Sequence, residues 1–173
     1  MSTRLQLRHM KKLHIPAVVE ISRACQLPAW SADTFERELI LDRRDYLIAI
    51  ANGRVLGFGG MMYVLEDAHL TVIGVHPEAR RSGIATVLLA KLLENAWRAK
   101  CSGATLEVRV DNRGAQSLYR RFEMTVDGVR PNYYEDGGDA AIMWHRAIAD
   151  PGAVRLRRRL ARLSRERWSE MSC

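Results

Sequence analysis

Residues 75–85 read VHPEARRSGIA and join an apolar run to a long amphipathic segment. The run before them, residues 70–75 (LTVIGV), indicates a buried strand, and apolar residues recur at helical spacing from Val87 to Trp97. A strand that enters a helix through a short basic loop with a glycine can hold an anion, because the first N–H groups of a helix lack partners and carry partial positive charge. The stretch therefore predicts either a phosphate site or an ordinary helix start.

The loop also indicates which ligand it would hold. Arg80 and Arg81 carry donors that can pair phosphate oxygens, and Gly83 lets a phosphate approach the backbone. The spacing fits neither the Walker P-loop nor the dinucleotide fingerprint, so ATP and NAD are not the first expectation. The loop resembles the R/Q-x-x-G-x-G/A segment that binds the coenzyme A pyrophosphate in the GCN5-related N-acetyltransferases. The resemblance assigns coenzyme contacts to Arg80, Arg81, Ser82, Gly83, Ile84, Ala85 and Thr86.

Length and composition predict an ordinary globular protein. The 173 residues suit one domain, with 47% hydrophobic and 27% charged residues. No apolar run approaches the roughly 18 residues of a membrane span, and the N-terminus does not resemble a secretory segment. Cys25, Cys101 and Cys173 are scattered, which favours reduced thiols in a cytoplasmic protein. The five histidines are scattered too, so no metal site is expected.

The positive charge is concentrated at the C-terminus. The net charge of +7 favours anionic partners, and residues 150–173 hold seven arginines against three acidic residues. We expect an N-acetyltransferase domain over residues 1–149 and an arginine-rich amphipathic extension over 150–173. A helix so short and charged orders only by docking on its own domain, on a second copy or on an anionic partner such as ribosomal RNA. Its expected apolar stripe is Ala153, Leu156, Leu160 and Leu163.

Periodicity and turn signals predict a mixed α/β fold. Asn52-Gly53, between two apolar alternating runs, is the strongest hairpin signal. The order β-α-α-β-β-β-α-β-α-β-β corresponds to a mixed, mostly antiparallel central sheet with helices on both faces, the order of the N-acetyltransferase fold. Expected helices cover residues 14–25, 31–40, 84–100 and 113–122. Expected strands cover residues 4–8, 46–51, 55–64, 69–75, 105–110, 125–130 and 140–145.

A second informative segment is LEVRVDN, residues 106–112, in which alternation places Glu107 and Arg109 on one face of a strand. L-E-V-R-x-x-N, followed by Leu118-Tyr119 and a basic residue, is similar to the ribosomal-protein-alanine N-acetyltransferases. These enzymes acetylate a protein N-terminus with acetyl-CoA. Residues 130–143 (RPNYYEDGGDAAIM) resemble their closing segment, and residues 28–31 (PAWS) resemble their P-W-S segment with one insertion.

The required chemistry suggests roles for two of these residues. An amine attacks a thioester only when it is neutral, and a carboxylate such as Glu107 can take its proton, directly or through water. A tyrosine hydroxyl such as that of Tyr119 can protonate the departing thiolate. On the residues alone, Glu107 is more simply a solvated strand residue paired with Arg109, and Tyr119 a helix residue packed on the sheet. The resemblance implies the catalytic roles instead.

The resemblance extends to the substrate sites. It places Asn112 beside the pantetheine arm of the coenzyme, although a helix N-cap fits that position equally well. The backbone of Ile73-Gly74-Val75 would pair with the pantetheine amides. Tyr133 and Tyr134 would line the acceptor groove or form a half-buried hairpin pair, and Trp30 would border that groove or pack in the core.

One segment departs from the family pattern. Phe122-Glu123-Met124 stands where the family usually has L-G-F. A glycine there would let the helix end in a left-handed conformation. Glu123 must therefore be strained, or the helix must end differently.

We expect an acetyl-CoA-dependent N-acetyltransferase whose acceptor is the N-terminal α-amine of a protein such as a ribosomal protein. One alternative is a small amine or a lysine side chain as acceptor. The pKa of an α-amine is about 7.7–8.0, whereas that of a lysine side chain is about 10.4. A single carboxylate with water can therefore deprotonate an α-amine more easily, which favours the N-terminal acceptor. The other alternative is an RNA- or ribosome-binding protein that uses the arginines of residues 155–167.

Overall fold

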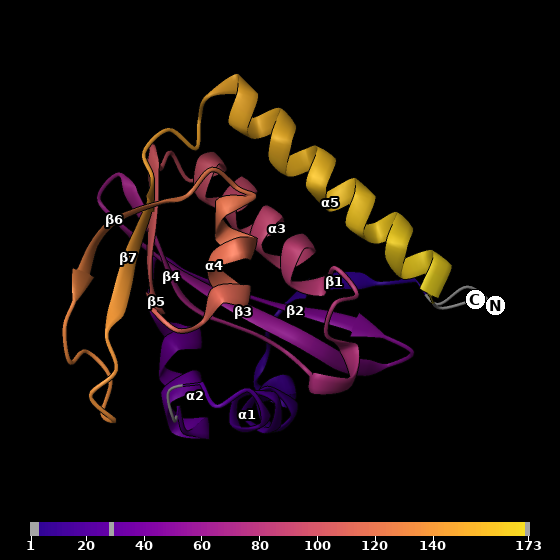
Figure 1. Cartoon of the computed structure of the whole chain (residues 1–173). Coiled ribbons are helices and arrows are strands. Elements are labelled where there is room, and N and C mark those ends of the chain that lie inside the picture. Colours follow the sequence, from indigo (N-terminus) through magenta and orange to yellow (C-terminus); the bar gives the residue numbers. More distant parts are fainter. Residues whose placement is uncertain (1–3, 28–29, 172–173) are drawn as a thin grey trace.

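The computed structural model describes residues 4–27 and 30–171, and over these it forms one seven-stranded sheet covered by helices on both faces (Figure 1). The elements are β1 (Gln6–His9), the 3-10 turn η1 (Lys12–His14), α1 (Ile15–Ala24), α2 (Ala32–Ile40), β2 (Arg44–Ala51), β3 (Arg54–Val64), β4 (Asp67–Val75), the 3-10 turn η2 (Pro77–Ala79), α3 (Ile84–Arg98), β5 (Gly103–Arg109), α4 (Arg113–Arg120), β6 (Thr125–Arg130), β7 (Ala140–His145) and α5 (Pro151–Met171).

The sheet has the strand order β1-β2-β3-β4-β5-β7-β6, and only its β4–β5 pairing is parallel among the described strands. The mixed, mostly antiparallel sheet predicted from the element order is confirmed. The Asn52-Gly53 turn has the positive φ angles, 50° and 73°, that a two-residue hairpin loop requires. Tight local signals of this kind fix the register of β2 against β3.

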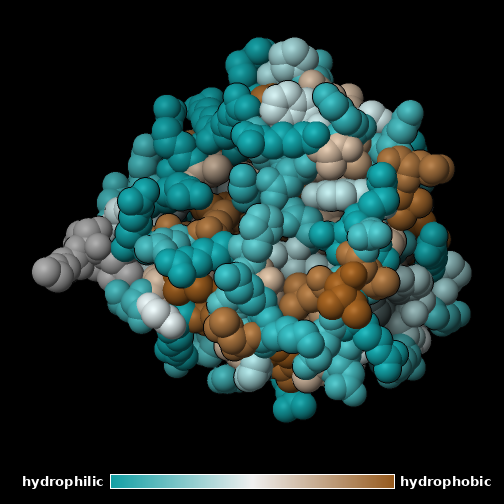
Figure 2. All heavy atoms as spheres, turned by 180° about the vertical axis from the view of Figure 1, so that it is seen from behind, coloured by the Kyte–Doolittle hydropathy of each residue, from teal (hydrophilic) through white to brown (hydrophobic). Residues whose placement is uncertain are grey.

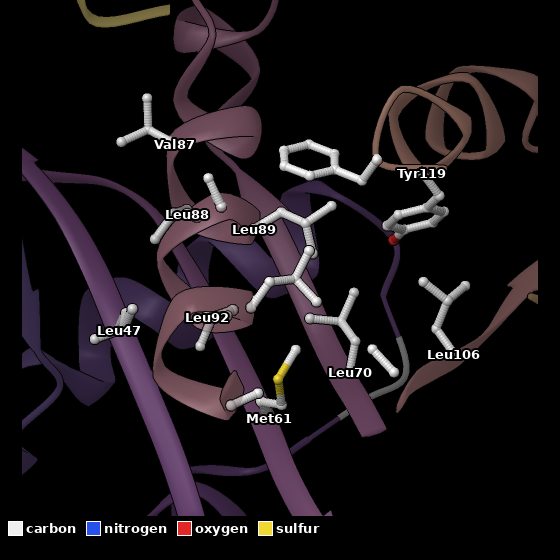
Figure 3. Packing of buried hydrophobic residues seen from close by; sticks show 14 of the residues in the cluster. Leu47, Met61, Leu70, Val87, Leu88, Leu89, Leu92, Leu106 and Tyr119 are labelled. Atoms are coloured by element: carbon white, nitrogen blue, oxygen red, sulfur yellow. The ribbon is translucent and has the colours of Figure 1, made fainter. Parts of the chain in front are cut away.

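Two apolar layers hold the helices on the sheet. α1 and α2 cover one face, where Phe35 and Phe58 are buried. α3 and α4 cover the other face, and Figure 3 shows the leucines of α3 directed at the strands, among them the buried Leu88 and Leu92. Burying each such side chain contributes roughly 1.5–3 kcal/mol. The sheet is therefore a rigid platform between two packed layers.

The parallel strands separate part-way along their length. β4 and β5 are paired at three positions, and the last pair is His69 with Thr105. β4 nevertheless continues to Val75 and β5 to Arg109. Beyond His69 the two strands therefore diverge, and the opening between them lies at their carboxyl ends, where ligands of α/β sheets commonly bind.

α5 lies along α3 on the outside of the molecule (Figure 1). Its anchor is Arg157, of which Nε donates to Glu94 Oε2 at 3.0 Å and Nη1 donates to the Ile148 carbonyl at 2.6 Å. Burial alone would raise the pKa of Glu94, but hydrogen bonds from Arg158 and Arg157 lower it below its usual value. The C-terminal helix thus docks on its own domain, one of the three expected modes.

The buried face of α5 agrees with the predicted stripe at Ala153, which is buried, and at Leu160, which packs against the core, but it departs from the stripe at Leu163. Leu163 is 45% exposed, whereas Arg157 is 2% exposed. The helix is rotated so that Arg157 and Ser164 face the domain, because Glu94 on α3 offers an ionic partner that a leucine could not use. Periodicity counts apolar residues and misses a buried charge pair of this kind.

The end of α4 resolves the departure at Glu123. Its φ angle is +60°, and the next residue, Met124, donates its N–H to the Tyr119 carbonyl at 3.2 Å. The helix therefore ends as it would with glycine, and Glu123 carries the strain of the left-handed conformation. α4 stops at Arg120, two residues before the predicted end.

The surface is predominantly hydrophilic. Figure 2 shows separate apolar patches among hydrophilic side chains on the face opposite to that of Figure 1. Across residues 4–27 and 30–171, we find no helix with the length and apolar character that a bilayer span demands.

Candidate active site

The predicted phosphate loop connects β4 to α3 at the opening between the parallel strands. Arg80 and Arg81 are exposed, whereas Ser82 is buried and its Oγ donates to the Ala79 carbonyl at 2.5 Å. Gly83 is left-handed at φ 88°, and within the described part of the chain no side chain caps the helix that follows. Uncapped N–H groups next to two guanidinium groups fit a pyrophosphate.

The end of β4 offers a second feature that fits coenzyme A. Residues 73–75 pair with β3 along one edge, while their other edge faces the opening beyond His69. The Cys25 thiol donates to the Val75 carbonyl at 3.1 Å, and Arg80 Nη2 lies 3.7 Å from Cys25 Sγ. An extended edge of this kind can hydrogen-bond an amide-containing arm such as pantetheine.

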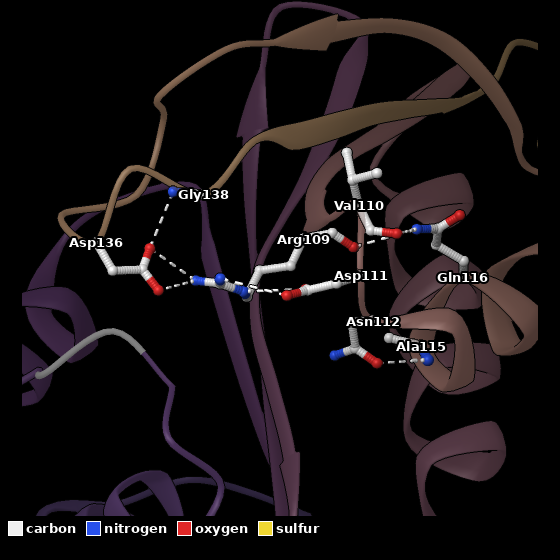
Figure 4. A network of polar contacts seen from close by, with 8 residues as sticks. All are labelled: Arg109, Val110, Asp111, Asn112, Ala115, Gln116, Asp136 and Gly138. Atoms are coloured by element: carbon white, nitrogen blue, oxygen red, sulfur yellow. Dashed lines mark hydrogen bonds and ion pairs between the residues drawn. The ribbon is translucent and has the colours of Figure 1, made fainter.

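Glu107 lies at the opening, with its side chain 12% exposed. Its Oε2 is 2.6 Å from His69 Nε2, and its Oε1 is 3.2 Å from Arg130 Nη1. The expected pairing of Glu107 with Arg109 is wrong, because Arg109 instead contacts Asp136 at 2.9 Å (Figure 4). A histidine and an arginine therefore hold the carboxylate from two sides.

His69 is a site residue that the sequence reasoning missed. It follows Ala68 in β4, and its partner in the parallel register is Thr105, two residues before Glu107. Side chains that point to the same face of neighbouring strands lie close together. The alternation of residues along β4 and β5 could therefore have placed His69 next to Glu107. That signal depends on knowing that β4 and β5 are adjacent.

Tyr119 approaches the site from the opposite side of the sheet. Its side chain extends from α4 toward the strands, in the layer that contains Leu106 (Figure 3). The residue is 5% exposed, and burial, with a smaller contribution from Tyr134, raises the pKa of its hydroxyl above its usual value. The hydroxyl therefore stays protonated at neutral pH, as a proton donor must.

The paired tyrosines lie in the connection between β6 and β7. Their rings meet edge to face, with centroids 5.1 Å apart. Arg109 lies over the Tyr134 ring at 4.9 Å and Arg130 over the Tyr133 ring at 5.8 Å. Because Arg130 also contacts Glu107, the structure brings both tyrosines to the surroundings of that carboxylate.

Asn112 is the N-cap of α4. Its Oδ1 accepts the Ala115 N–H at 3.0 Å, and Gln116 Nε2 donates to the carbonyls of Arg109 and Val110 at 3.1 and 2.9 Å (Figure 4). The cap alternative for Asn112 is confirmed. Its contact with a pantetheine arm stays a prediction.

Trp30 packs against the aromatic layer beneath the sheet. Its ring centroid is 5.3 Å from that of Phe35 and 6.5 Å from that of Tyr46. Core packing, one of its two predicted roles, is therefore present. Pro28 and Ala29, the start of the predicted P-W-S segment, lie outside the described residues. Across the described ranges, no group of three or more His, Cys, Asp or Glu side chains is arranged to hold a metal ion.

Similarity to known proteins agrees with this geometry. The model of the family described as "Acetyltransferase (GNAT) family" matches residues 15–124. A Bacillus subtilis protein named "Putative ribosomal protein bS18-alanine N-acetyltransferase" is 36% identical over 146 residues, which cover 83% of this chain and 97% of that protein. The chain belongs to the GNAT acetyltransferase family.

Two further relatives support this assignment. The Mycobacterium tuberculosis protein "N-alpha-acetyltransferase RimI" is 32% identical over 126 residues, which cover 70% of this chain and 78% of that protein. The crystal structure of the ribosomal-protein-S18-alanine N-acetyltransferase from Escherichia coli superposes with a TM-score of 0.74 at 29% identity, covering 81% of this chain and 92% of that one. This GNAT protein is an acetyl-CoA-dependent N-acetyltransferase. The predicted fold, family and enzyme class are confirmed, and the roles of individual residues stay predictions.

Proposed function

We propose that this GNAT enzyme acetylates the N-terminal α-amine of a protein, with a ribosomal protein as the acceptor. The names of the Bacillus subtilis and Escherichia coli relatives support that acceptor class. The observation that carries the proposal is the position of Glu107, held by His69 and Arg130 beside the opening between β4 and β5. A base at that point can reach an amine that approaches a thioester bound in the opening.

We assign the coenzyme to the β4–α3 connection. Its pyrophosphate would lie on the backbone of residues 80–86, and its pantetheine arm would run along residues 73–75 with Asn112 beside it. When bound, acetyl-CoA supplies an acetyl group from its thioester, and coenzyme A then leaves with a free thiol. The exposed guanidinium groups of Arg80 and Arg81 would offset the phosphate charge.

Glu107 acts as the general base in this proposal. It accepts one proton from the acceptor ammonium, directly or through a water, and passes it to solvent. The neutral amine then forms the C–N bond as the C–S bond breaks, and its nitrogen loses a second proton to Glu107 as the amide forms. His69 and Arg130 orient the carboxylate by contacts at 2.6 and 3.2 Å. The first of these protons leaves an α-ammonium at a pKa of about 7.7–8.0 and a lysine ammonium at about 10.4, which favours the α-amine as acceptor.

Tyr119 acts as the general acid. Its hydroxyl would donate a proton to the departing sulfur across the opening, opposite Glu107. The resemblance to the family supports this role. Burial raises the pKa of the hydroxyl, which keeps it protonated, so the basicity of the departing thiolate must drive the transfer. Tyr133, Tyr134 and Trp30 would line the groove for the acceptor peptide on the Glu107 side.

The exposed arginines of α5 favour a second contact, with the ribosome that carries the acceptor. Their side chains are exposed and their guanidinium groups can pair RNA phosphates, although Arg158 Nη2 also donates to Glu94 Oε1 of α3 at 2.9 Å. Binding to ribosomes should therefore weaken steeply with salt, whereas peptide acetylation should not. The exposed arginines are Arg155, Arg158, Arg159, Arg162, Arg165 and Arg167.

A panel of acceptors tests the proposal. The protein is incubated with acetyl-CoA and alanine-starting hexapeptides, the same peptides with a blocked N-terminus and an internal lysine, and small polyamines. We expect product from the free N-terminal peptides and little from the others. Preferred turnover of blocked lysine peptides or polyamines would overturn the assigned acceptor. Binding of ribosomes without turnover of any acceptor would favour the RNA-binding alternative.

A further inference from the structure

α5 meets both ends of α3. Near the C-terminal end of α3, Arg157 is clamped to Glu94 and lies over the Trp97 ring at 5.3 Å. Near the N-terminal end, Ser164 is 7% exposed and rests on Gly83 of the phosphate loop. The helix therefore spans the length of α3 and reaches the glycine that precedes it.

The contact at Gly83 is tight. A Cβ atom built on Gly83 would lie 2.8 Å from Ser164 Cβ and 3.2 Å from both Ser164 Cα and the Ser164 carbonyl oxygen. The neighbouring atoms belong to the backbone of α5, so they cannot move aside without moving the helix. The absence of a side chain at Gly83 therefore serves the packing of α5, because Ser164 fills the space that a Cβ atom would need.

The loop requires such support. Arg81 and Gly83 both have left-handed backbone angles, with φ of 61° and 88°, and no side chain caps α3 among the described residues. A non-glycine residue in this conformation is strained and persists only where surrounding contacts hold it. Ser164 supplies one of these contacts from outside the loop.

We propose that α5 is part of the coenzyme site, with Ser164 as a positioning residue that holds the phosphate loop in its binding conformation. The inference rests on the proposed placement of acetyl-CoA on residues 80–86. A loop held in advance binds its ligand without the cost of ordering itself. Because coupling is reciprocal, bound coenzyme must in turn strengthen the docking of α5.

The first test measures coenzyme A affinity by calorimetry in Ser164→Leu, Ser164→Ala and Ser169→Leu. The leucine at 164 has no room against Gly83, so its Kd should rise about tenfold, within the usual range of coupling between sites. Alanine keeps the Cβ atom that makes the contact and should bind like the unchanged protein. Ser169→Leu makes the same chemical change at an exposed position of α5 and should also leave the Kd unchanged.

Kinetics separate positioning from general damage. In Ser164→Leu the KM for acetyl-CoA should rise with the Kd, while kcat at saturating acetyl-CoA and the KM for the peptide stay within about twofold. Equal losses in all three would overturn the proposal, because they would indicate a disturbed fold. An unchanged Kd in a folded Ser164→Leu protein would overturn it as well.

Hydrogen exchange on the unchanged protein completes the test. We expect added coenzyme A to protect the amides of residues 80–86 and also those of α5 around Ser164. Protection of the loop without protection of α5 would sink this inference and leave the proposed coenzyme site standing. Absence of protection in the loop itself would instead remove the coenzyme placement on which the inference rests.

Discussion

The two helices that follow the parallel strands begin in opposite ways. α4 is closed by its own sequence, since the Asn112 side chain accepts the Ala115 N–H at 3.0 Å. α3 begins at a left-handed Gly83 without a side-chain cap among the described residues, next to the exposed Arg80 and Arg81. One strand-to-helix connection satisfies its own donors, and the other leaves them for an anion.

This difference suggests separate roles for the two strand-to-helix connections. In the proposed function the β4–α3 connection binds the coenzyme, whereas Glu107 in β5 and Tyr119 in α4 act from either side of the opening. Changes at Glu107 and Tyr119 should therefore alter turnover and leave coenzyme affinity intact. The following variants test that division.

The largest effect is expected for Glu107→Gln. The amide keeps the shape of the side chain but cannot accept the proton, so kcat should fall on the order of 10²–10⁴-fold. The Kd of coenzyme A, measured by calorimetry, should barely change, because the loop of residues 80–86 is untouched. Glu135→Gln, in the exposed β6–β7 connection, is the matched control. A rate within a few-fold of the unchanged enzyme would assign the proton to another group.

Tyr119→Phe removes one hydroxyl from a buried ring. Phenylalanine packs similarly, so the fold should survive while kcat falls by about 10²-fold, at the lower end for proton transfer. An acetyl donor with a more acidic thiol needs less help in leaving, and it should restore most of the rate. If the defect persists with that donor, Tyr119 positions substrate and donates no proton.

Asn112→Ala tests the closed start of α4. Loss of the cap should lower the free energy of unfolding by about 1 kcal/mol, measured by chemical denaturation. In α2 the Ser31 Oγ accepts the Thr34 N–H at 3.2 Å. Ser31→Ala removes this cap and should lower the free energy of unfolding by a similar amount. The proposed contact of Asn112 with the pantetheine arm predicts a raised Kd of coenzyme A in Asn112→Ala but not in Ser31→Ala, and an unchanged Kd in both would leave Asn112 as a helix cap alone.

Local signals made most of the fold predictable. Asn52-Gly53 fixed a hairpin, and Ser31 marked the start of α2, because turn and cap chemistry depends on neighbouring residues alone. The connection from β4 through Gly83 to α3 was predictable for the same reason, since the strand, the basic loop and the helix follow each other in the chain, whereas its binding of a phosphate stays a prediction.

Long-range pairings were not predictable in the same way. The contact of Glu107 with His69 joins residues 38 positions apart and depends on the parallel pairing of β4 with β5. The buried pair of Arg157 with Glu94 shifted the expected face of α5 by about one residue, because a charge can be buried when its partner is. Ser164 carries no sequence signal at all, since a small residue against a glycine is evident only from the packed helices.

The smallest expected effect concerns the other end of α4, where the helix is not closed by a suitable residue. Glu123 has a φ of +60°, a conformation that costs a non-glycine residue roughly 1–2 kcal/mol, while glycine loses about 0.5–1 kcal/mol in backbone entropy. Glu123→Gly should therefore raise the free energy of unfolding by about 0.5–1 kcal/mol. The lost contact between Glu123 Oε2 and His145 Nε2 is long, at 3.7 Å, and its carboxylate is 59% exposed, so it should subtract little. Glu123→Ala removes the same carboxylate but keeps the Cβ atom and should not stabilise. Equal stabilisation by alanine and glycine would assign the effect to charge and not to the left-handed backbone.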